Sequence, residues 1–236
     1  MTIDTNPRIE PAREIRRVDE IATMARRFGF VSAVGVVAFS VAYAIPLTIG
    51  LLTLPSKEAP IADPWFTMME WLILLSAPLM VTLSVCIHLV APPARRPFSL
   101  ASLVFMGMAA LVTCSVHFTI ITVSHLPAIA KLPWTPSLLS FAWPSVPYAL
   151  DILAWDFFFP LSVLLAAAVF GGSRLTNAIR IVLLLSGLVS LVGLFGPAAN
   201  NMDLRSVGIV GYAIIFPIAV VLMARMFRAP VAPFQT

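Results

Sequence analysis

Six apolar segments, each long enough to cross a membrane as a helix, dominate the sequence. They cover residues 29–54, 65–90, 98–126, 148–170, 179–199 and 207–227. A helix needs about 20 apolar residues to cross the hydrocarbon layer, which is roughly 30 Å thick. Lipid cannot satisfy backbone polar groups, and barrel strands would alternate over about ten residues, so the runs predict helices. We therefore expect an all-α fold, a polytopic membrane bundle of six transmembrane helices.

Charged residues are scarce along the whole chain. They make up 11% of the 236 residues, whereas soluble domains carry about 25%. We therefore expect no soluble domain and divide the chain into three parts: a cytoplasmic basic segment over residues 1–27, a single six-helix transmembrane domain over residues 28–228 and a cytoplasmic tail over residues 229–236. The basic residues stand at the ends of apolar runs, which speaks against a nucleic-acid partner.

Positive charges are distributed unevenly between the two sets of connections. One set, which includes both termini, carries twelve: Arg8, Arg13, Arg16, Arg17, Arg26, Arg27, Arg95, Arg96, Arg174, Arg180, Arg225 and Arg228. The other set carries three: Lys57, Lys131 and Arg205. Because Lys and Arg favour the cytoplasmic side of a membrane, both termini are predicted to be cytoplasmic. An even number of spans agrees with that orientation.

An amphipathic pattern precedes the first run. Apolar residues recur there at helical spacing with charges between them: Ile15, Val18, Ile21, Ala22 and Ala25. The pattern predicts a cytoplasmic interfacial helix whose arginines contact anionic headgroups. A solvated tail is the alternative.

Two aspartates interrupt the fourth run, in the stretch YALDILAWDFFFP. A charge at the centre of a bilayer costs about 2.5–3.5 kcal/mol on insertion scales, so these side chains should face the bundle interior. At about 1.5 Å of rise per residue, Asp156 lies roughly 12 Å from the outer end of its run and His117 roughly 13 Å from that of its own. We therefore predict that Asp156 pairs with His117. Glu70, Asp151 and His125 form a shallower tier.

The spacing of the two aspartates favours Asp156 for the central role. Residues five apart on an α-helix are about 140° apart around its axis, so both carboxylates cannot point at one spot. Asp151 is then expected near the headgroups. The candidate catalytic residues are Asp156, His117, Glu70 and Asp151.

Aromatic residues gather in the same, outer half of the predicted bundle. All five tryptophans fall there, and the connection between the third and fourth runs holds two of them with five prolines. We interpret this connection as a stiff cap over the outer mouth. An interfacial belt explains most of the tryptophans, but Trp71 and Trp155 each stand beside a carboxylate. The candidate ligand-binding residues are Trp71, Trp155, Tyr148, Tyr43 and His125.

Several function classes find no support in the sequence. A bis-histidine haem needs two histidines at one depth, and His88 and His117 differ by roughly 20 Å along the axis. A metal site from His117, His125, Glu70 and Asp156 is an alternative that has no spacing motif. No protease signature occurs, and the inner half is too apolar to line a channel. We expect no cofactor and no metal.

The prediction that survives is an acidic and aromatic pocket in the outer half, for a lipophilic molecule with a polar or cationic part. One hypothesis is an enzyme that uses a carboxylic acid as general acid or base on a lipid-like or isoprenoid-like substrate, with aromatic faces stabilising positive charge. Such a site is similar in general style to integral-membrane terpene cyclases, which are small, all-helical and carry embedded acids. The chain shares no motif with them residue by residue.

Two further hypotheses stay open. The first is a proton-linked small-molecule carrier or ligand sensor without catalysis, and the second is a purely structural membrane bundle. Membrane lipids and a lipophilic small molecule are the predicted partners. The sequence leaves open whether copies of the chain form a homo-oligomer.

Overall fold

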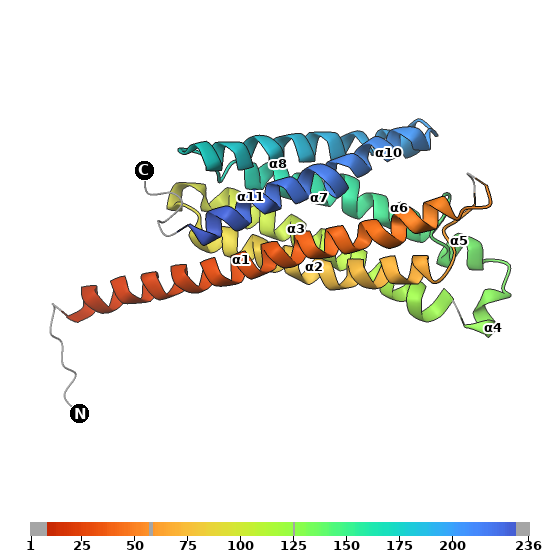
Figure 1. Cartoon of the computed structure of the whole chain (residues 1–236), viewed down its shortest axis with the longest axis horizontal. Helices are drawn as coiled ribbons and strands as arrows, with labels where there is room; N and C mark the ends of the chain where they lie inside the picture. Colours follow the sequence, from red (N-terminus) through yellow and green to blue (C-terminus); the bar gives the residue numbers. More distant parts are fainter. Residues whose placement is uncertain (1–8, 57–58, 125, 230–236) are drawn as a thin grey trace, which may run out of the picture.

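The computed structural model describes residues 9–56, 59–124 and 126–229, with side chains from residue 19 on. All regular secondary structure in these residues is helical, which confirms the predicted all-α fold (Figure 1). The elements are α1 (Ile9–Leu52), α2 (Trp65–Val90), η1 (Pro93–Arg95), α3 (Arg96–Thr119), η2 (Ile120–Ser124), α4 (Pro127–Ala130), α5 (Thr135–Leu139), α6 (Val146–Ile152), η3 (Leu153–Phe158), α7 (Phe159–Ala167), α8 (Arg174–Val192), α9 (Phe195–Ala198), α10 (Met202–Val210), η4 (Gly211–Ile215) and α11 (Phe216–Arg228).

Six rods built from these elements are long and apolar enough to cross a membrane, and each predicted run overlaps one of them. The first two rods are α1 and α2. The others are composite: η1, α3 and η2 form the third, α6, η3 and α7 the fourth, α8 and α9 the fifth, and α10, η4 and α11 the sixth. The rods form an elongated bundle in which α1 begins and α11 ends at the same end (Figure 1).

The first rod is longer than expected. The sequence suggested an interfacial helix followed by a separate span, but α1 is one continuous helix of 44 residues. At 1.5 Å of rise per residue its length is about 66 Å. Its first turns project beyond the rest of the bundle (Figure 1). The predicted helix therefore exists, but it is not a separate element.

Three short segments are π-helical, with a wider turn than an α-helix: η2, η3 and η4. Proline follows two of them, because Pro160 is the second residue of α7 and Pro217 the second residue of α11. A proline has no N–H to donate and its ring clashes with the carbonyl four residues earlier. A switch to i→i+5 hydrogen bonds just before the proline relieves that conflict.

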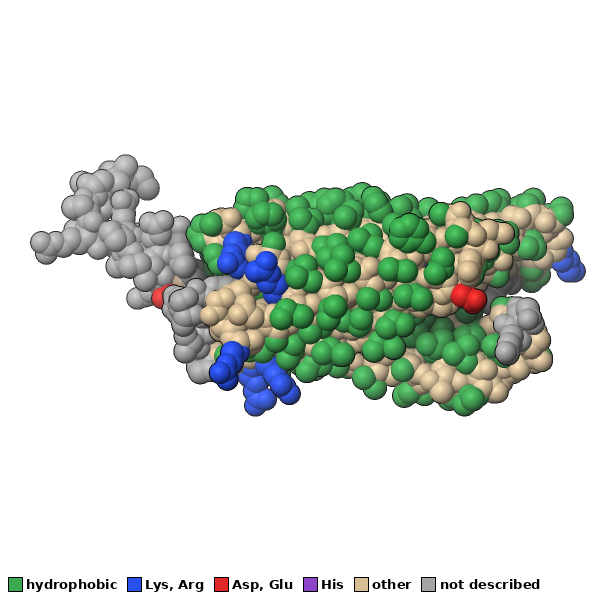
Figure 2. All heavy atoms as spheres, turned by 90° about the horizontal axis from the view of Figure 1, so that it is seen from above, with side chains coloured by type: hydrophobic (Ala, Val, Ile, Leu, Met, Phe, Trp, Pro, Cys, Tyr) green, Lys and Arg blue, Asp and Glu red, His purple; other side chains and the backbone are tan. Residues whose placement is uncertain are grey.

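The apolar core fills the half of the bundle nearest the termini. Its deeply buried members include residues of α2, α7, α8 and α11: Leu83, Val163, Ile179, Leu183, Val220 and Met223. On the face that Figure 2 shows, the surface of this half is mainly apolar, and most of the Lys and Arg side chains in view gather toward its end. The buried charged groups lie in the other half.

Candidate functional site

Polar side chains from several rods meet in the half of the bundle away from the termini. Three of them lie within the first two turns of helices that begin at that end: Glu70 on α2, Asp151 on α6 and Arg205 on α10. Capping side chains start two of these helices, since Ser145 caps α6 and Asn201 caps α10 through hydrogen bonds to backbone N–H groups. The starting points of the helices therefore set the depth of the site.

His117, near the end of α3, lies between two acidic side chains. Its Nδ1 is 2.8 Å from Oε2 of Glu70, and its Nε2 is 3.5 Å from Oδ1 of Asp151. The second distance suits an ion pair but is too long for a good hydrogen bond. Glu70 is 2% exposed, His117 1% and Asp151 5%. The three groups therefore have one another, and not water, as partners for hydrogen bonds and charge.

Arg205 joins the two aspartates. Its Nη2 donates to Oδ2 of Asp151 at 3.1 Å, and its Nη1 donates to the hydroxyl of Tyr212 at 2.6 Å. Its Nε is 3.1 Å from Oδ2 of Asp156, although the alignment is that of an ion pair and not of a hydrogen bond. The guanidinium also lies over the rings of Tyr148 and Tyr212, with its carbon 5.7 and 5.6 Å from their centres.

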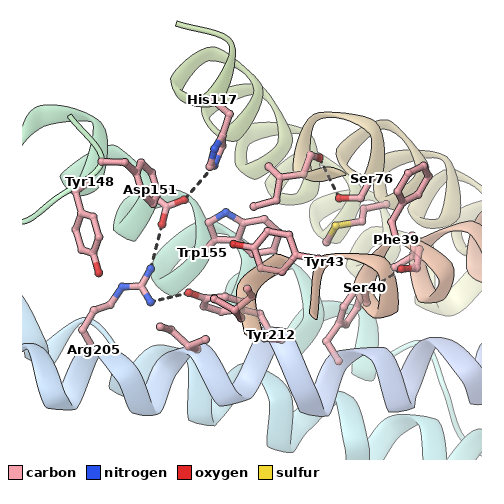
Figure 3. A pocket seen from close by; sticks show the side chains of 18 residues that line it. Phe39, Ser40, Tyr43, Ser76, His117, Tyr148, Asp151, Trp155, Arg205 and Tyr212 are labelled. Carbon is pink, nitrogen blue, oxygen red and sulfur yellow. Dashed lines mark hydrogen bonds and ion pairs between the residues drawn. The ribbon is translucent and has the colours of Figure 1, made fainter. Parts of the chain in front are cut away.

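A continuous line of charged groups therefore crosses the bundle. It runs from Glu70 through His117, Asp151 and Arg205 to Asp156, and the close-up shows its central members (Figure 3). These four contacts are the only ion pairs among the side chains that the structure describes. Electrostatic interactions in the described part of the chain are thus concentrated at one place.

The π-helical segment η3 explains how both aspartates reach one arginine. The predicted separation of about 140° assumes an α-helix throughout. In a π-helix the hydrogen bonds join residues five apart, which places such residues on one face. Because η3 begins two residues after Asp151 and contains Asp156, both carboxylates turn toward Arg205. The expectation that both carboxylates cannot point at one spot is therefore wrong.

The predicted pair of Asp156 and His117 is not formed. His117 contacts Glu70 and Asp151, whereas Asp156 contacts Arg205. The depth estimate assumed a uniform rise per residue, but η2 follows α3 and η3 contains Asp156, and a wider turn takes more residues for the same axial length. The second, third and fourth rods do turn their acidic and imidazole groups toward each other through α2, α3 and α6, with Glu70 and Asp151 as the partners of His117.

Two glycines make room for the carboxyl group of Asp156, which is fully buried. A Cβ built on Gly193 would lie 2.5 Å from Oδ1 of Asp156, and one on Gly208 would lie 2.7 Å from the same atom. The Cβ on Gly208 would also lie 2.7 Å from the Cα of Gly193, where the backbone cannot move aside easily. The close approach of α8 and α10 around this carboxyl group therefore requires glycine.

Gly208→Ala is expected to destabilise the protein by about 1–3 kcal/mol, the usual cost of overpacking a buried site. The matched control is Gly107→Ala on α3, where no heavy atom lies within 4 Å of the added Cβ. Alanine favours a helix over glycine by roughly 0.5–1 kcal/mol, so the control should be neutral or stabilising. Thermal unfolding of both variants in the same detergent measures the difference, and equal melting temperatures would contradict the packing described here.

A cavity of about 230 Å³ borders the charged line. His117, Asp151 and Arg205 face it, whereas Glu70 and Asp156 do not belong to its lining. Aromatic rings make up much of the remaining wall: Phe39, Tyr43, Phe141, Tyr148, Trp155 and Tyr212 (Figure 3). A ligand with a polar head and an apolar body could thus contact the charged groups with its head and the aromatic rings with its body.

The cavity is walled by α1 on one side and by α10 and η4 on the other. The main partners of α1 are α2 and α11 rather than α10. The space-filling view shows the surface hollowed in the same half of the bundle (Figure 2). We infer that the cavity opens sideways between α1 and α10.

The connection between the third and fourth rods covers the cluster with a phenylalanine. Phe141 packs against His117, with ring centres 5.2 Å apart, and against Tyr148 at 5.4 Å. Of the predicted tryptophans of the cap, Trp134 is 43% exposed, whereas Trp143 is 37% exposed and packs against Tyr148 with ring centres 6.3 Å apart. The connection thus contributes Phe141 to the cavity wall, and its Trp143 contacts a residue of that wall.

The predicted ligand-binding residues fall into three groups. Tyr43, Tyr148 and Trp155 line the cavity. Trp71 does not line the cavity and is 49% exposed. Adjacent residues of a helix point in different directions, and its neighbour Glu70 points inward. His125 lies outside the described residues.

Sequence reasoning missed Arg205 and Tyr212 as parts of the site. The sixth apolar run begins at Val207, so the sequence alone places Arg205 in an outer connection. Asn201 as a helix cap and Asp203 in the first turn are signals of an earlier start, which would have placed Arg205 inside the helix. Tyr212 follows seven residues later, on the same face.

The chain matches no family model, no curated protein and no solved structure. Within the described residues, no group of three or more His, Cys, Asp and Glu side chains could hold a metal ion. Glu70 and Asp151 lie on opposite sides of the imidazole of His117, which keeps them from sharing one ion.

Proposed function

We propose that the protein is a multi-pass membrane protein with both termini cytoplasmic, and that it binds a lipophilic cation in the cavity of its outer half. Six apolar helices support membrane insertion. The burial of Arg205 inside the bundle leaves only Lys57 and Lys131 on the side opposite the termini, against twelve arginines on the other side. That contrast supports the orientation.

The observation that carries the ligand proposal is the unequal number of acidic and basic groups in the charged line. Three carboxyl groups, of Glu70, Asp151 and Asp156, meet two basic groups, of His117 and Arg205. With all five groups ionised, one negative charge is left over. A buried excess charge is costly, so the cluster needs one additional positive charge. A proton or the head of a cationic ligand supplies it.

The walls of the cavity suit a cation with an apolar body. Aromatic rings stabilise cations through their faces, most strongly where water is excluded, and aromatic cages are a known way of binding quaternary ammonium groups. Asp151 is the carboxyl group that faces the cavity, so it is the natural counter-ion of the head. The apolar body would then extend toward the opening between α1 and α10.

Exchange of a proton for the cation follows from the same charge balance. When the cationic head enters, the extra proton is no longer needed and leaves. The complex then holds fewer protons than the free protein, so a lower pH favours the free protein and the affinity rises with pH. Such an exchange suits a proton-linked carrier or a ligand sensor.

The proposal is tested with two probes of equal chain length on protein in lipid nanodiscs. Radiolabelled dodecyltrimethylammonium carries a fixed positive charge, and dodecanol carries none. We expect saturable binding of the cation above the level of empty nanodiscs, with an affinity that rises with pH. Dodecanol should only partition into the lipid, as it does in empty nanodiscs. Saturable binding of both probes to the same extent, or of neither, would refute the proposal.

An acid–base enzyme acting on a lipid-like substrate is the second candidate, and the setting of His117 favours it. Glu70 contacts Nδ1, so Nε2 faces Asp151 beside the cavity. An imidazole oriented by a carboxylate at the edge of a pocket is a suitable general acid or base. Incubation with a lipid extract, followed by mass spectrometry of the lipids, distinguishes the two functions. Products that the wild type forms and His117→Gln does not form would show that the protein is an enzyme.

A further inference from the structure

Four arginines from α1 and α11 line a cleft at the end of the bundle nearest the termini. One cavity of about 420 Å³ has Arg26, Arg27 and Arg228 in its wall. A second cavity, of about 240 Å³, has Arg225 and Arg228 in its wall. Arg228 and Phe30 belong to both, so the two cavities adjoin. We propose that this cleft binds one anionic phospholipid, with its phosphate among the arginines.

The arginines of the cleft have no acidic partner among the described residues. Every ion pair in the described part of the chain belongs to the charged line in the other half. Arg26 is half-buried, and Arg27, Arg225 and Arg228 are exposed. Guanidinium groups bind phosphate through paired N–H donors, which makes such a set of unpaired arginines complementary to a phosphate group.

The second cavity is apolar where it runs away from the arginines. In that part its wall consists of Phe30, Val34, Val37, Val221 and Ala224. A free phosphate ion would use only the basic part of the cleft, whereas a phospholipid would place its phosphate there and an acyl chain along the apolar part. The shape of the cleft therefore favours a lipid.

Close packing holds the two helices together at the cleft. The ring of Phe227 on α11 lies where a side chain on Gly29 of α1 would be, since a Cβ there would be 2.7 Å from the ring. Phe227 is buried and also lines the larger cavity. The arginines on both helices are thus presented at a fixed separation, unlike basic residues scattered along an interface.

This inference rests on the proposed membrane insertion and orientation, but not on the proposed ligand of the outer cavity. The test is native mass spectrometry of the protein with an equimolar mixture of phosphatidylglycerol and phosphatidylcholine of identical acyl chains. We expect the wild type to retain one phosphatidylglycerol in preference to phosphatidylcholine. Excess inorganic phosphate should not displace it, because the ion cannot replace the acyl chain.

The decisive variant is Arg26→Gln combined with Arg228→Gln, which should lower the preference for phosphatidylglycerol about tenfold. The control is Arg174→Gln combined with Arg180→Gln, which removes two positive charges at the start of α8, near the same end but outside the cleft. The control should keep the preference. Equal losses in both variants, or no preference in the wild type, would overturn the proposal. Binding of the cationic probe by the same preparations shows separately whether the outer cavity is intact.

Discussion

Arg205→Gln is expected to lower the free energy of unfolding by about 3–5 kcal/mol, the usual cost of removing one partner from a buried ion pair. Arg205 is 3% exposed and is the basic group that contacts both Asp151 and Asp156. Without it, Asp156 keeps no partner of opposite charge, and it is fully buried. Unfolding in detergent micelles, followed by circular dichroism, measures the loss.

A double variant shows whether the loss comes from the charges themselves. Arg205→Gln combined with Asp156→Asn removes one charge of each sign, so it should be more stable than Arg205→Gln alone. Arg225→Gln is the control, since Arg225 is exposed and its replacement should change stability by no more than about 0.5 kcal/mol. The single variant Asp156→Asn is measured as well. If the stability losses of Arg205→Gln and Asp156→Asn simply add in the double variant, the pairing of Arg205 with Asp156 does not stabilise the fold.

Asp151→Asn is expected to weaken binding of dodecyltrimethylammonium by at least about 30-fold, or ~2 kcal/mol, as when one member of a buried charge pair is removed. Two effects combine. Asp151 is the carboxyl group that faces the cavity, and its loss leaves two acidic groups against two basic ones, so the cluster no longer needs a further positive charge. Binding of the radiolabelled probe in nanodiscs measures the change.

The control for this variant is Asp63→Asn. Asp63 is exposed at the same end of the bundle, where it accepts a hydrogen bond from Thr67, and it lies outside the cavity. The substitution removes the same charge, so binding that depends only on the surface charge of this end would fall in both variants. If the Asp151→Asn variant binds the cation as tightly as the Asp63→Asn variant does, Asp151 is not the counter-ion.

The six long apolar helices could be predicted because length and apolar character decide them locally. The same reasoning brought Glu70, His117 and Asp151 into one half of the bundle, since depth follows from position along a helix. It could not predict which of these groups touch. Contacts depend on the rotation of each helix, and η3 changes that rotation between Asp151 and Asp156.

The sequence did not predict the place of Arg205 in the site for a different reason. An arginine close to the end of an apolar run is ordinarily a loop residue that helps to orient the chain. Arg205 is instead the fourth residue of α10, which begins at Met202, and its side chain is buried in the bundle. Trp71 does not line the cavity, because its position next to Glu70 in the sequence does not fix the direction of its side chain. Both errors concern the rotation and start of helices, which packing determines.

The number of protons released when dodecyltrimethylammonium binds tests the central claim most directly. The quaternary ammonium group of the probe has no dissociable proton, so any proton released comes from the protein. Calorimetric titrations in two buffers of different ionisation enthalpy give that number. The account predicts about one proton per bound cation in the wild type and none in Asp151→Asn, because the cluster exchanges one positive charge for another. Tight binding of the cation to the wild type without proton release would contradict it.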